Sequence, residues 1–161
     1  LPPPPHSAPV GLRPAFPDPP GAAVSVCHSA DDDRPDTDKE PVGNFCWNEL
    51  WAQDAAKSLA FYEKTFGYTH DTMPGPDGDY YILKGPDGKA RAGLMKMPDP
   101  QAPTLWCPYV HVASCDATAE KAKKLGAQLM MPPTDIPTVG RIAVIIDPQG
   151  AALSWIQPAM A

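Results

Sequence analysis

Two ionisable side chains, Glu49 and His111, stand out because each lies in a short apolar segment that is typical of a buried strand. A carboxylate held between two tryptophans could act as a general base toward a small ligand. With Cys107 as a third donor the pair could instead hold a metal ion, since catalytic zinc usually has three protein ligands. A structural role also fits, with Glu49 held by a hydrogen bond or ion pair, and His111 neutral and bonded to Tyr109 or to backbone.

The segments around these side chains repeat in a fixed order. Residues 44–53 and 105–113 are each typical of a strand, and each is followed by a helical pattern that ends at a glycine, Gly67 or Gly126. Three more strand-like segments follow each helix, and turns rich in Pro and Gly separate several of them. The two helix-ending glycines are 59 residues apart, so the pattern predicts a duplicated β-α-β-β-β module.

The predicted organisation is one α+β domain, residues 44–161, behind an N-terminal extension, residues 1–43. Module 1 is expected at 44–98 and module 2 at 104–158. The extension is rich in Pro and in acidic residues, which predicts an extended arm, partly in the polyproline II conformation. Such a segment cannot bury enough apolar surface to offset its ordering entropy alone. We therefore expect the arm to lie against its own domain, a second copy or another subunit.

Composition narrows the function classes. The 161 residues are 43% hydrophobic, which suits one globular domain, and no apolar run of about 18 residues predicts a membrane span. The net charge of -6, without a basic stripe, makes a nucleic-acid partner unexpected. Four cysteines without a C-x-x-C pattern favour reduced thiols. The first residue, Leu1, predicts a processed or truncated chain, from an organelle after leader removal or from the cytoplasm.

Two long segments carry a family resemblance. Residues 44–68, NFCWNELWAQDAAKSLAFYEKTFGY, resemble the opening of a vicinal oxygen chelate module, with the helix motif AFYEKTFG. Residues 135–158, DIPTVGRIAVIIDPQGAALSWIQP, are similar to the closing strands of that superfamily, which includes glyoxalase I, fosfomycin and bleomycin resistance proteins, and extradiol dioxygenases. The similarity is greatest to the lactoylglutathione lyase-related branch. It implies two modules joined in one cup-shaped mixed sheet, with helices outside and a divalent metal in the cup.

The resemblance places the metal-ligand positions on residues that suit such a metal poorly. These positions fall on Trp47, Cys107 and Ser154, and near Gly93 or Met95. None of these is His, Asp or Glu, which a Zn, Ni, Mn or Fe site of this family requires. We therefore expect no metal and no other cofactor.

Strand alternation assigns one row of side chains from each module to the cup. The expected ligand pocket is lined by Trp47, Glu49, Trp51, Cys107, Tyr109, His111 and Ser154. The candidates for catalysis within it are Glu49 and His111.

Three functions remain open. The favoured one is a binding or accessory subunit with a degenerate metal site, docked through residues 1–40 to other protein subunits or as a homodimer. The second is a metal-free protein that binds a small aromatic ligand, like bleomycin resistance proteins. The third is a metal-dependent lyase or isomerase resembling lactoylglutathione lyase, so an enzymatic role is the less favoured prediction.

Overall fold

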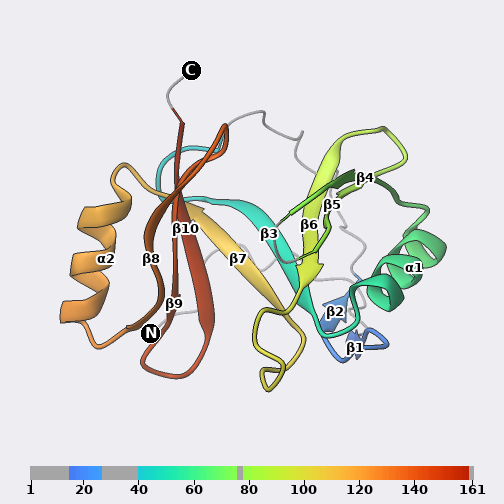
Figure 1. Cartoon of the computed structure of the whole chain (residues 1–161), viewed down its shortest axis with the longest axis horizontal. Helices are drawn as coiled ribbons and strands as arrows, with labels where there is room; N and C mark the ends of the chain where they lie inside the picture. Colours follow the sequence, from blue (N-terminus) through green and yellow to red (C-terminus); the bar gives the residue numbers. More distant parts are fainter. Residues whose placement is uncertain (1–14, 27–39, 76–77, 160–161) are drawn as a thin grey trace, which may run out of the picture.

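The computed structural model describes residues 15–26, 40–75 and 78–159, and it has the predicted α+β architecture (Figure 1). In chain order its elements are β1 (Ala15–Pro17), β2 (Ala23–Ser25), β3 (Phe45–Ala52), α1 (Ala55–Phe66), β4 (Thr69–Met73), β5 (Tyr80–Lys84), β6 (Ala90–Lys96), β7 (Leu105–His111), α2 (Cys115–Lys124), β8 (Gln128–Ile136), β9 (Gly140–Ile146) and β10 (Ala152–Pro158). Neither described helix has the length and hydrophobicity needed to cross a bilayer.

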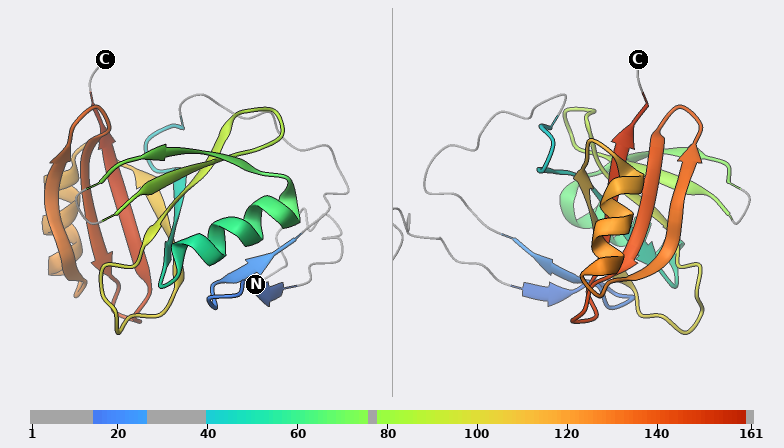
Figure 2. Two further views of the ribbon diagram at one scale, coloured as in Figure 1. Left: turned by 45° about the vertical axis from the view of Figure 1, so that its right-hand side comes forward. Right: turned by 90° about the vertical axis from the view of Figure 1, so that its left-hand side faces the viewer.

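The eight longer strands form one mixed sheet whose order repeats in two halves. The order is β4-β5-β6-β3-β7-β10-β9-β8, so each half places its first strand beside its last one. The pairs β3–β6 and β7–β10 are parallel, and β3 joins β7 antiparallel at the centre. The sheet curves strongly, and α1 and α2 lie at its two ends (Figures 1 and 2). This arrangement confirms the predicted duplication and the curved mixed sheet.

Helix α1 begins and ends where its sequence predicts. The Asp54 carboxylate accepts a hydrogen bond from the backbone N–H of Lys57 at 3.0 Å, which caps the first turn. Gly67 has φ 68° and donates its N–H to the carbonyl of Glu63, which ends the helix in a conformation that favours glycine. Tyr62 is buried on the helix face that packs against β3. The caps thus fix α1 over the strand that carries Glu49.

The second module has its own core, under α2. Cys115 and Ala119 of α2 are buried against Ala143, Ile145 and Trp155 of the sheet. The Ser114 hydroxyl caps this helix by accepting from the N–H of Ala117. Each half of the sheet therefore buries its own helix, as a duplicated module requires.

Part of the N-terminal segment packs onto module 1. Residues 15–26 hold the β1–β2 hairpin, which lies beside α1 (Figure 2). Ala22 is 1% exposed and belongs to the same core as Leu50 and Tyr62. The hairpin lies within the segment 1–43 that the sequence set apart from the domain. Residues 40–43 lead into β3, and residues 1–14 and 27–39 of the predicted extended arm lie outside the described residues.

The N-cap of α1 yields a direct test of this local account. Asp54→Ala should lower the free energy of unfolding by about 1 kcal/mol, because the N–H of Lys57 loses its acceptor. Urea unfolding monitored by circular dichroism measures the change. Lys57→Ala, in the same exposed turn, is the control and should change stability by no more than about 0.5 kcal/mol. Equal effects of the two substitutions would contradict the role of the cap.

Candidate functional site

The candidate site lies on the face of the central strands that points away from the helices. On β3, Leu50 and Ala52 belong to the core beneath α1, so the alternating Glu49 and Trp51 point to the opposite face. In the antiparallel β3–β7 ladder, Glu49 is directly opposite Cys107. The strand register therefore brings cup residues of both modules together at the centre of the sheet.

The carboxylate of Glu49 is the centre of this group. Glu49 is only 6% exposed. Its Oε2 accepts a hydrogen bond from Trp51 Nε1 at 2.6 Å and another from the Tyr109 hydroxyl at 2.8 Å. Tyr109 is also buried. No ion pair among the described residues includes Glu49. The carboxylate is therefore held by neutral donors rather than by a cation.

The electrostatics of the site keep its phenols protonated. Burial raises the pKa of Tyr109 well above its ordinary value, and the nearby negative charge of Glu49 raises it further. Burial and then Glu49 likewise raise the pKa of Tyr80, on β5. Both hydroxyls consequently remain hydrogen-bond donors at neutral pH.

Tyr80 occupies the module 1 side of the site. Trp47 Nε1 donates to the Tyr80 hydroxyl at 3.3 Å. Gly93, the register partner of Glu49 on β6, leaves room for that hydroxyl, because a Cβ at this position would collide with it. Two positions assigned to metal ligands by resemblance are therefore occupied by an indole and by a glycine whose space a phenol fills.

The module 2 side is closed by a contact between Cys107 and Ser154. Both residues are fully buried, and Sγ and Oγ are 3.1 Å apart. Burial raises the pKa of the Cys107 thiol to about 11, so the group is a neutral thiol at physiological pH. Metal binding and nucleophilic attack both require the thiolate. Without a metal ion, this pair is therefore an uncharged thiol–hydroxyl contact.

His111 has a different environment from Glu49. Its Nδ1 lies 2.6 Å from the backbone carbonyl oxygen of Glu40, and since a carbonyl only accepts, Nδ1 carries the proton. The backbone of His111 also bonds to Gly43 and Asn44. The structure thus ties His111 to the segment before β3, and the hydrogen bonds of its side chain and of Glu49 share no partner among the described residues.

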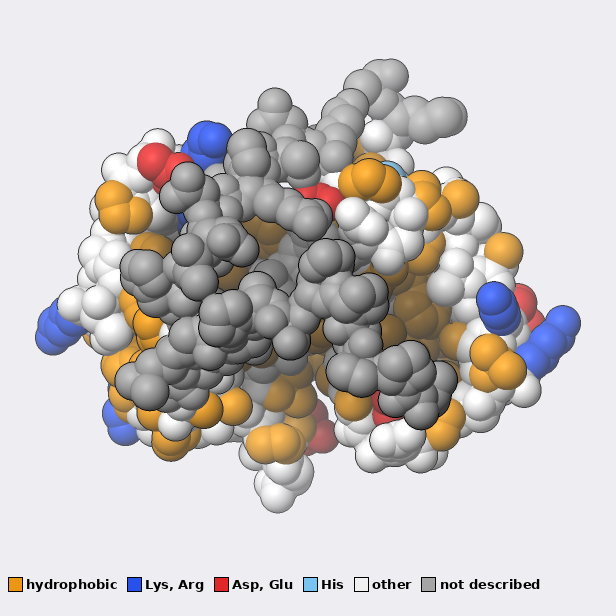
Figure 3. All heavy atoms as spheres, turned by 180° about the vertical axis from the view of Figure 1, so that it is seen from behind, with side chains coloured by type: hydrophobic (Ala, Val, Ile, Leu, Met, Phe, Trp, Pro, Cys, Tyr) orange, Lys and Arg blue, Asp and Glu red, His pale blue; other side chains and the backbone are white. Residues whose placement is uncertain are grey.

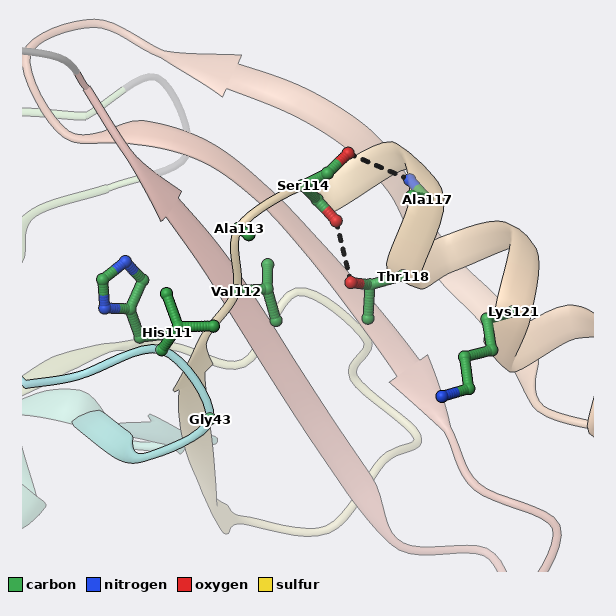
Figure 4. Close-up of a pocket in the computed structure, with 9 residues that line it drawn as sticks. Gly43, His111, Val112, Ala113, Ser114, Ala117, Thr118 and Lys121 are labelled. Atoms are coloured by element: carbon green, nitrogen blue, oxygen red, sulfur yellow. Dashed lines mark hydrogen bonds between the residues drawn. The ribbon is translucent and has the colours of Figure 1, made fainter.

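A shallow pocket of about 370 Å³ lies beside His111, at the start of α2 (Figure 4). Its lining includes Val42, Val112, Thr118 and Lys121. The Ser114 hydroxyl that faces α2 is already used by the N–H of Ala117. The pocket therefore offers an apolar wall with one cation at its rim, and it does not reach the contacts of Glu49.

The described residues contain no group of three or more His, Cys, Asp or Glu side chains placed to hold a metal ion. A space-filling view from behind shows hydrophobic side chains gathered around a hollow toward the half that carries α2 (Figure 3). Trp47 and Trp51, which flank Glu49, are half-buried. Aromatic and hydrogen-bonding groups, rather than charged ligands, therefore dominate the site.

The sheet order and this site can now be compared with known proteins. A sequence model of the glyoxalase/bleomycin resistance protein/dioxygenase superfamily matches residues 45–154, more than half of the chain. The chain belongs to this superfamily. This membership confirms the resemblance carried by the strand and helix motifs of residues 44–68 and 135–158.

Two curated relatives match this chain over only part of their own length. CFP32 of Mycobacterium tuberculosis, which is named as a glyoxylase, is 42% identical over 143 residues, covering 88% of this chain and 54% of the relative. The anthracycline biosynthesis protein DnrV of Streptomyces peucetius is 29% identical over 122 residues, covering 67% of this chain and 44% of the relative. The chain thus spans about half the length of these relatives.

Solved structures show the same fold at low sequence identity. Methylmalonyl-CoA epimerase from Streptomyces coelicolor aligns with a TM-score of 0.55 at 16% identity, over 75% of this chain and 98% of the epimerase. The 2,2',3-trihydroxybiphenyl 1,2-dioxygenase of Sphingomonas wittichii aligns with a TM-score of 0.60 at 16% identity, over 90% of this chain and 55% of the dioxygenase. These similarities establish the architecture alone.

Two participants in the site were not among the predicted pocket residues. Tyr80 lies in one of the strand-like segments after the first helix, and its contact with Trp47 depends on the β5–β6–β3 register, which the sequence does not give. Glu40 lies in the acidic segment before β3, and no pattern there indicates a bond to His111. Strand alternation within Tyr80–Lys84 is the one signal that could have placed Tyr80 on the cup face.

Alkaline unfolding tests the burial of Tyr109. Its pKa is raised in the folded state, so its contribution to stability is fully present below about pH 10 and is lost as the pH rises toward the folded pKa. The free energy of unfolding should therefore fall between about pH 8 and about pH 11. Tyr109→Phe should reduce that fall. Urea unfolding at both pH values measures the difference, and an unchanged pH dependence in Tyr109→Phe would contradict it.

Two substitutions of similar size test whether Glu49 is needed as a hydrogen-bond acceptor. Glu49→Leu should lower the free energy of unfolding by about 2 to 5 kcal/mol, because two buried donors lose their acceptor. Glu49→Gln should cost about 1 kcal/mol or less, since both donors use one oxygen and an amide oxygen can replace it. Equilibrium unfolding in urea measures both changes. The exposed Glu120→Leu is the control, and equal losses for Gln and Leu at position 49 would refute the acceptor role.

Proposed function

We propose that the chain is a glyoxalase-like binding domain with a degenerate metal site, acting as an accessory rather than as an enzyme. The proposal rests on the residues that occupy the family's metal-ligand positions and on their contacts. Trp47 bonds to Tyr80, Cys107 contacts Ser154, and Gly93 accommodates the Tyr80 hydroxyl. These groups satisfy one another and include no carboxylate or imidazole, so they do not fit a divalent cation that prefers such ligands.

The cup favours a planar aromatic ligand that carries hydroxyl groups. Trp47 and Trp51 are half-buried and flank Glu49 on the same strand, so their rings can contact a flat molecule. Trp51 and Tyr109 donate to the Glu49 carboxylate and Tyr80 also bonds to it, so about three of its roughly four lone-pair sites are used. A ligand hydroxyl can take another site. The relative named as an anthracycline biosynthesis protein supports this ligand class, because anthracyclines are hydroxylated planar aromatics.

The metal-dependent lyase or isomerase remains the alternative, and the relative named as a glyoxylase supports it. It would require Glu49 and His111 to act on one substrate. The His111 ring bonds to the Glu40 carbonyl, whereas Glu49 bonds to Trp51 and Tyr109, so the two side chains share no hydrogen-bond partner that would hold them on one substrate. The binding function does not require the two to act together.

Binding of 1,4-dihydroxyanthraquinone, followed by quenching of tryptophan fluorescence, tests the proposal. We expect micromolar binding that is the same with and without EDTA. Glu49→Gln should weaken it about tenfold or more, because an amide NH₂ opposes a hydroxyl donor where the carboxylate only accepted. Trp106→Phe is the matched control, because Trp106 packs on the α1 side of the sheet and donates to Tyr62. Its affinity should be unchanged.

Two results would overturn the proposal. Loss of binding in EDTA, restored by Zn²⁺ or Ni²⁺, would show a working metal site. Equal weakening by Glu49→Gln and Trp106→Phe would place the ligand outside the cup.

A further inference from the structure

Three turns in the chain share one hydrogen-bond pattern. They begin at Asp18, Gly85 and Asp147. In each, the first residue donates its N–H to the carbonyl of the residue four positions later, at 2.8, 2.9 and 2.9 Å. In each, the glycine three positions later donates back to the first residue, at 2.9, 2.9 and 3.0 Å. The second and third turns connect the closing strand pairs of module 1 (β5–β6) and module 2 (β9–β10).

The first turn therefore has the form of the closing turn of a module. Its sequence Asp-Pro-Pro-Gly-Ala-Ala, residues 18–23, nearly repeats Asp-Pro-Gln-Gly-Ala-Ala, residues 147–152. Gly21 and Gly150 both have positive φ, at 112° and 95°. The strand registers also agree, since β1–β2 pairs Pro17 with Ala23 where β9–β10 pairs residues 146 and 152. The three turns are 67 and 62 residues apart, which is close to one module length each time.

The strands of this hairpin lack the neighbours that a module supplies. In module 2, β9 pairs with β8 and β10 pairs with β7. Among the described residues, β1 and β2 form a sheet of two strands only. An isolated hairpin is marginally stable in water, so this one depends on what it packs against.

Its support is the side of α1 that carries Ser58 and Tyr62. Asp18 is 2% exposed, and its Oδ1 accepts from the N–H groups of Gly21 and Ala22. Asp147 Oδ1 likewise accepts within its own turn, from the N–H groups of Gln149 and Ala151. Asp18 Oδ2 lies 3.3 Å from the hydroxyls of Ser58 and Tyr62, which both donate to it. This second pair of contacts joins the hairpin to the helix.

Aromatic packing continues the same interface. The rings of Phe16 and Phe61 meet edge to face at 6.4 Å, and Ala22 completes the apolar contact. We infer that residues 15–26 are the closing hairpin of a further glyoxalase-like module, and that the side of α1 with Ser58, Phe61 and Tyr62 is the interface that receives such a hairpin. The partner at this face is thus another unit of the same fold, whose remaining strands would pair with the open edges of β1 and β2.

The equivalent face of α2 does not carry this interface. With the N-cap residues Asp54 and Ser114 of the two helices setting an offset of 60, Ser58 and Tyr62 correspond to Thr118 and Ala122. Ala122 has no hydroxyl, and Thr118 donates its own to the Ser114 carbonyl at 2.7 Å. Of the two helices, only α1 therefore has the hydroxyl pair that binds the hairpin. A contact repeated in every module would appear on both helices, whereas an interface between units needs it on one only.

The matches to known proteins agree with this reading. The match to CFP32 covers 88% of the chain and must therefore include residues 20–142. The dioxygenase aligns over 90%, which must include residues 17–145, and about half of each of these proteins lies outside the match. The epimerase, almost wholly aligned, covers 75% of the chain. The longer proteins thus extend the similarity into the N-terminal hairpin.

An exchange of hairpins in the full chain tests the inference independently of any ligand in the cup. Residues 16–25 are replaced by the chain's own residues 145–154, which keep an Asp at position 18. A second chain carries the same ten residues in scrambled order, with the Asp moved. Amide hydrogen exchange at residues 21–25 reports docking, and amides of β7 report that the domain remains folded. The exchanged hairpin should retain protection within about threefold of the native one, and the scrambled hairpin should lose about tenfold or more.

The double substitution Ser58→Ala and Tyr62→Phe completes the test, because it removes both hydroxyl donors and little volume. It should lower hairpin protection about tenfold in both the native and the exchanged chain. The inference is overturned if the exchanged hairpin is as unprotected as the scrambled one, if the scrambled one stays protected, or if the double substitution leaves the exchanged hairpin unaffected.

Discussion

A carboxylate buried without a cation is the constraint around which the centre of this protein is organised. Leaving Glu49 unpaired would be expensive, so the cup must supply donors, and it does so with Trp51 and Tyr109 from the two central strands. The same demand explains why Tyr109 stays a phenol: burial and the neighbouring negative charge both raise its pKa. Trp47, Tyr80 and Gly93 then fill the rest of the floor on the module 1 side. Neutral hydrogen-bond donors, rather than a cation, thus satisfy the carboxylate at the centre of this duplicated fold.

Much of the architecture was predictable because it depends on local chemistry that repeats. The helix-ending Gly67 and Gly126, 59 residues apart, identified the duplication, and alternation along β3 separated Leu50 from Glu49. The partners of Glu49 and His111 were harder to predict, because they depend on which strands are adjacent and in what register. Trp51 lies two residues from Glu49 on one strand, whereas Tyr109 reaches it across the β3–β7 ladder.

The N-terminal hairpin was missed for a related reason. Composition alone describes residues 1–43 as Pro-rich and acidic, which favours an extended arm. The meaning of Asp18 depends on two hydroxyls 40 and 44 residues away, on α1. Its turn repeats one that ends module 2, so it is read correctly only when the whole chain is compared with itself.

The most direct test of the central claim is an anomalous difference map from a crystal of the full chain soaked in Zn²⁺ or Mn²⁺. The account predicts no anomalous peak among Trp47, Glu49, Cys107 and Ser154, with the Tyr109 hydroxyl still bonded to Glu49. A fully occupied peak coordinated by Glu49 or Cys107 would contradict it, because the neutral hydrogen-bond network would then be a resting arrangement of a working metal centre.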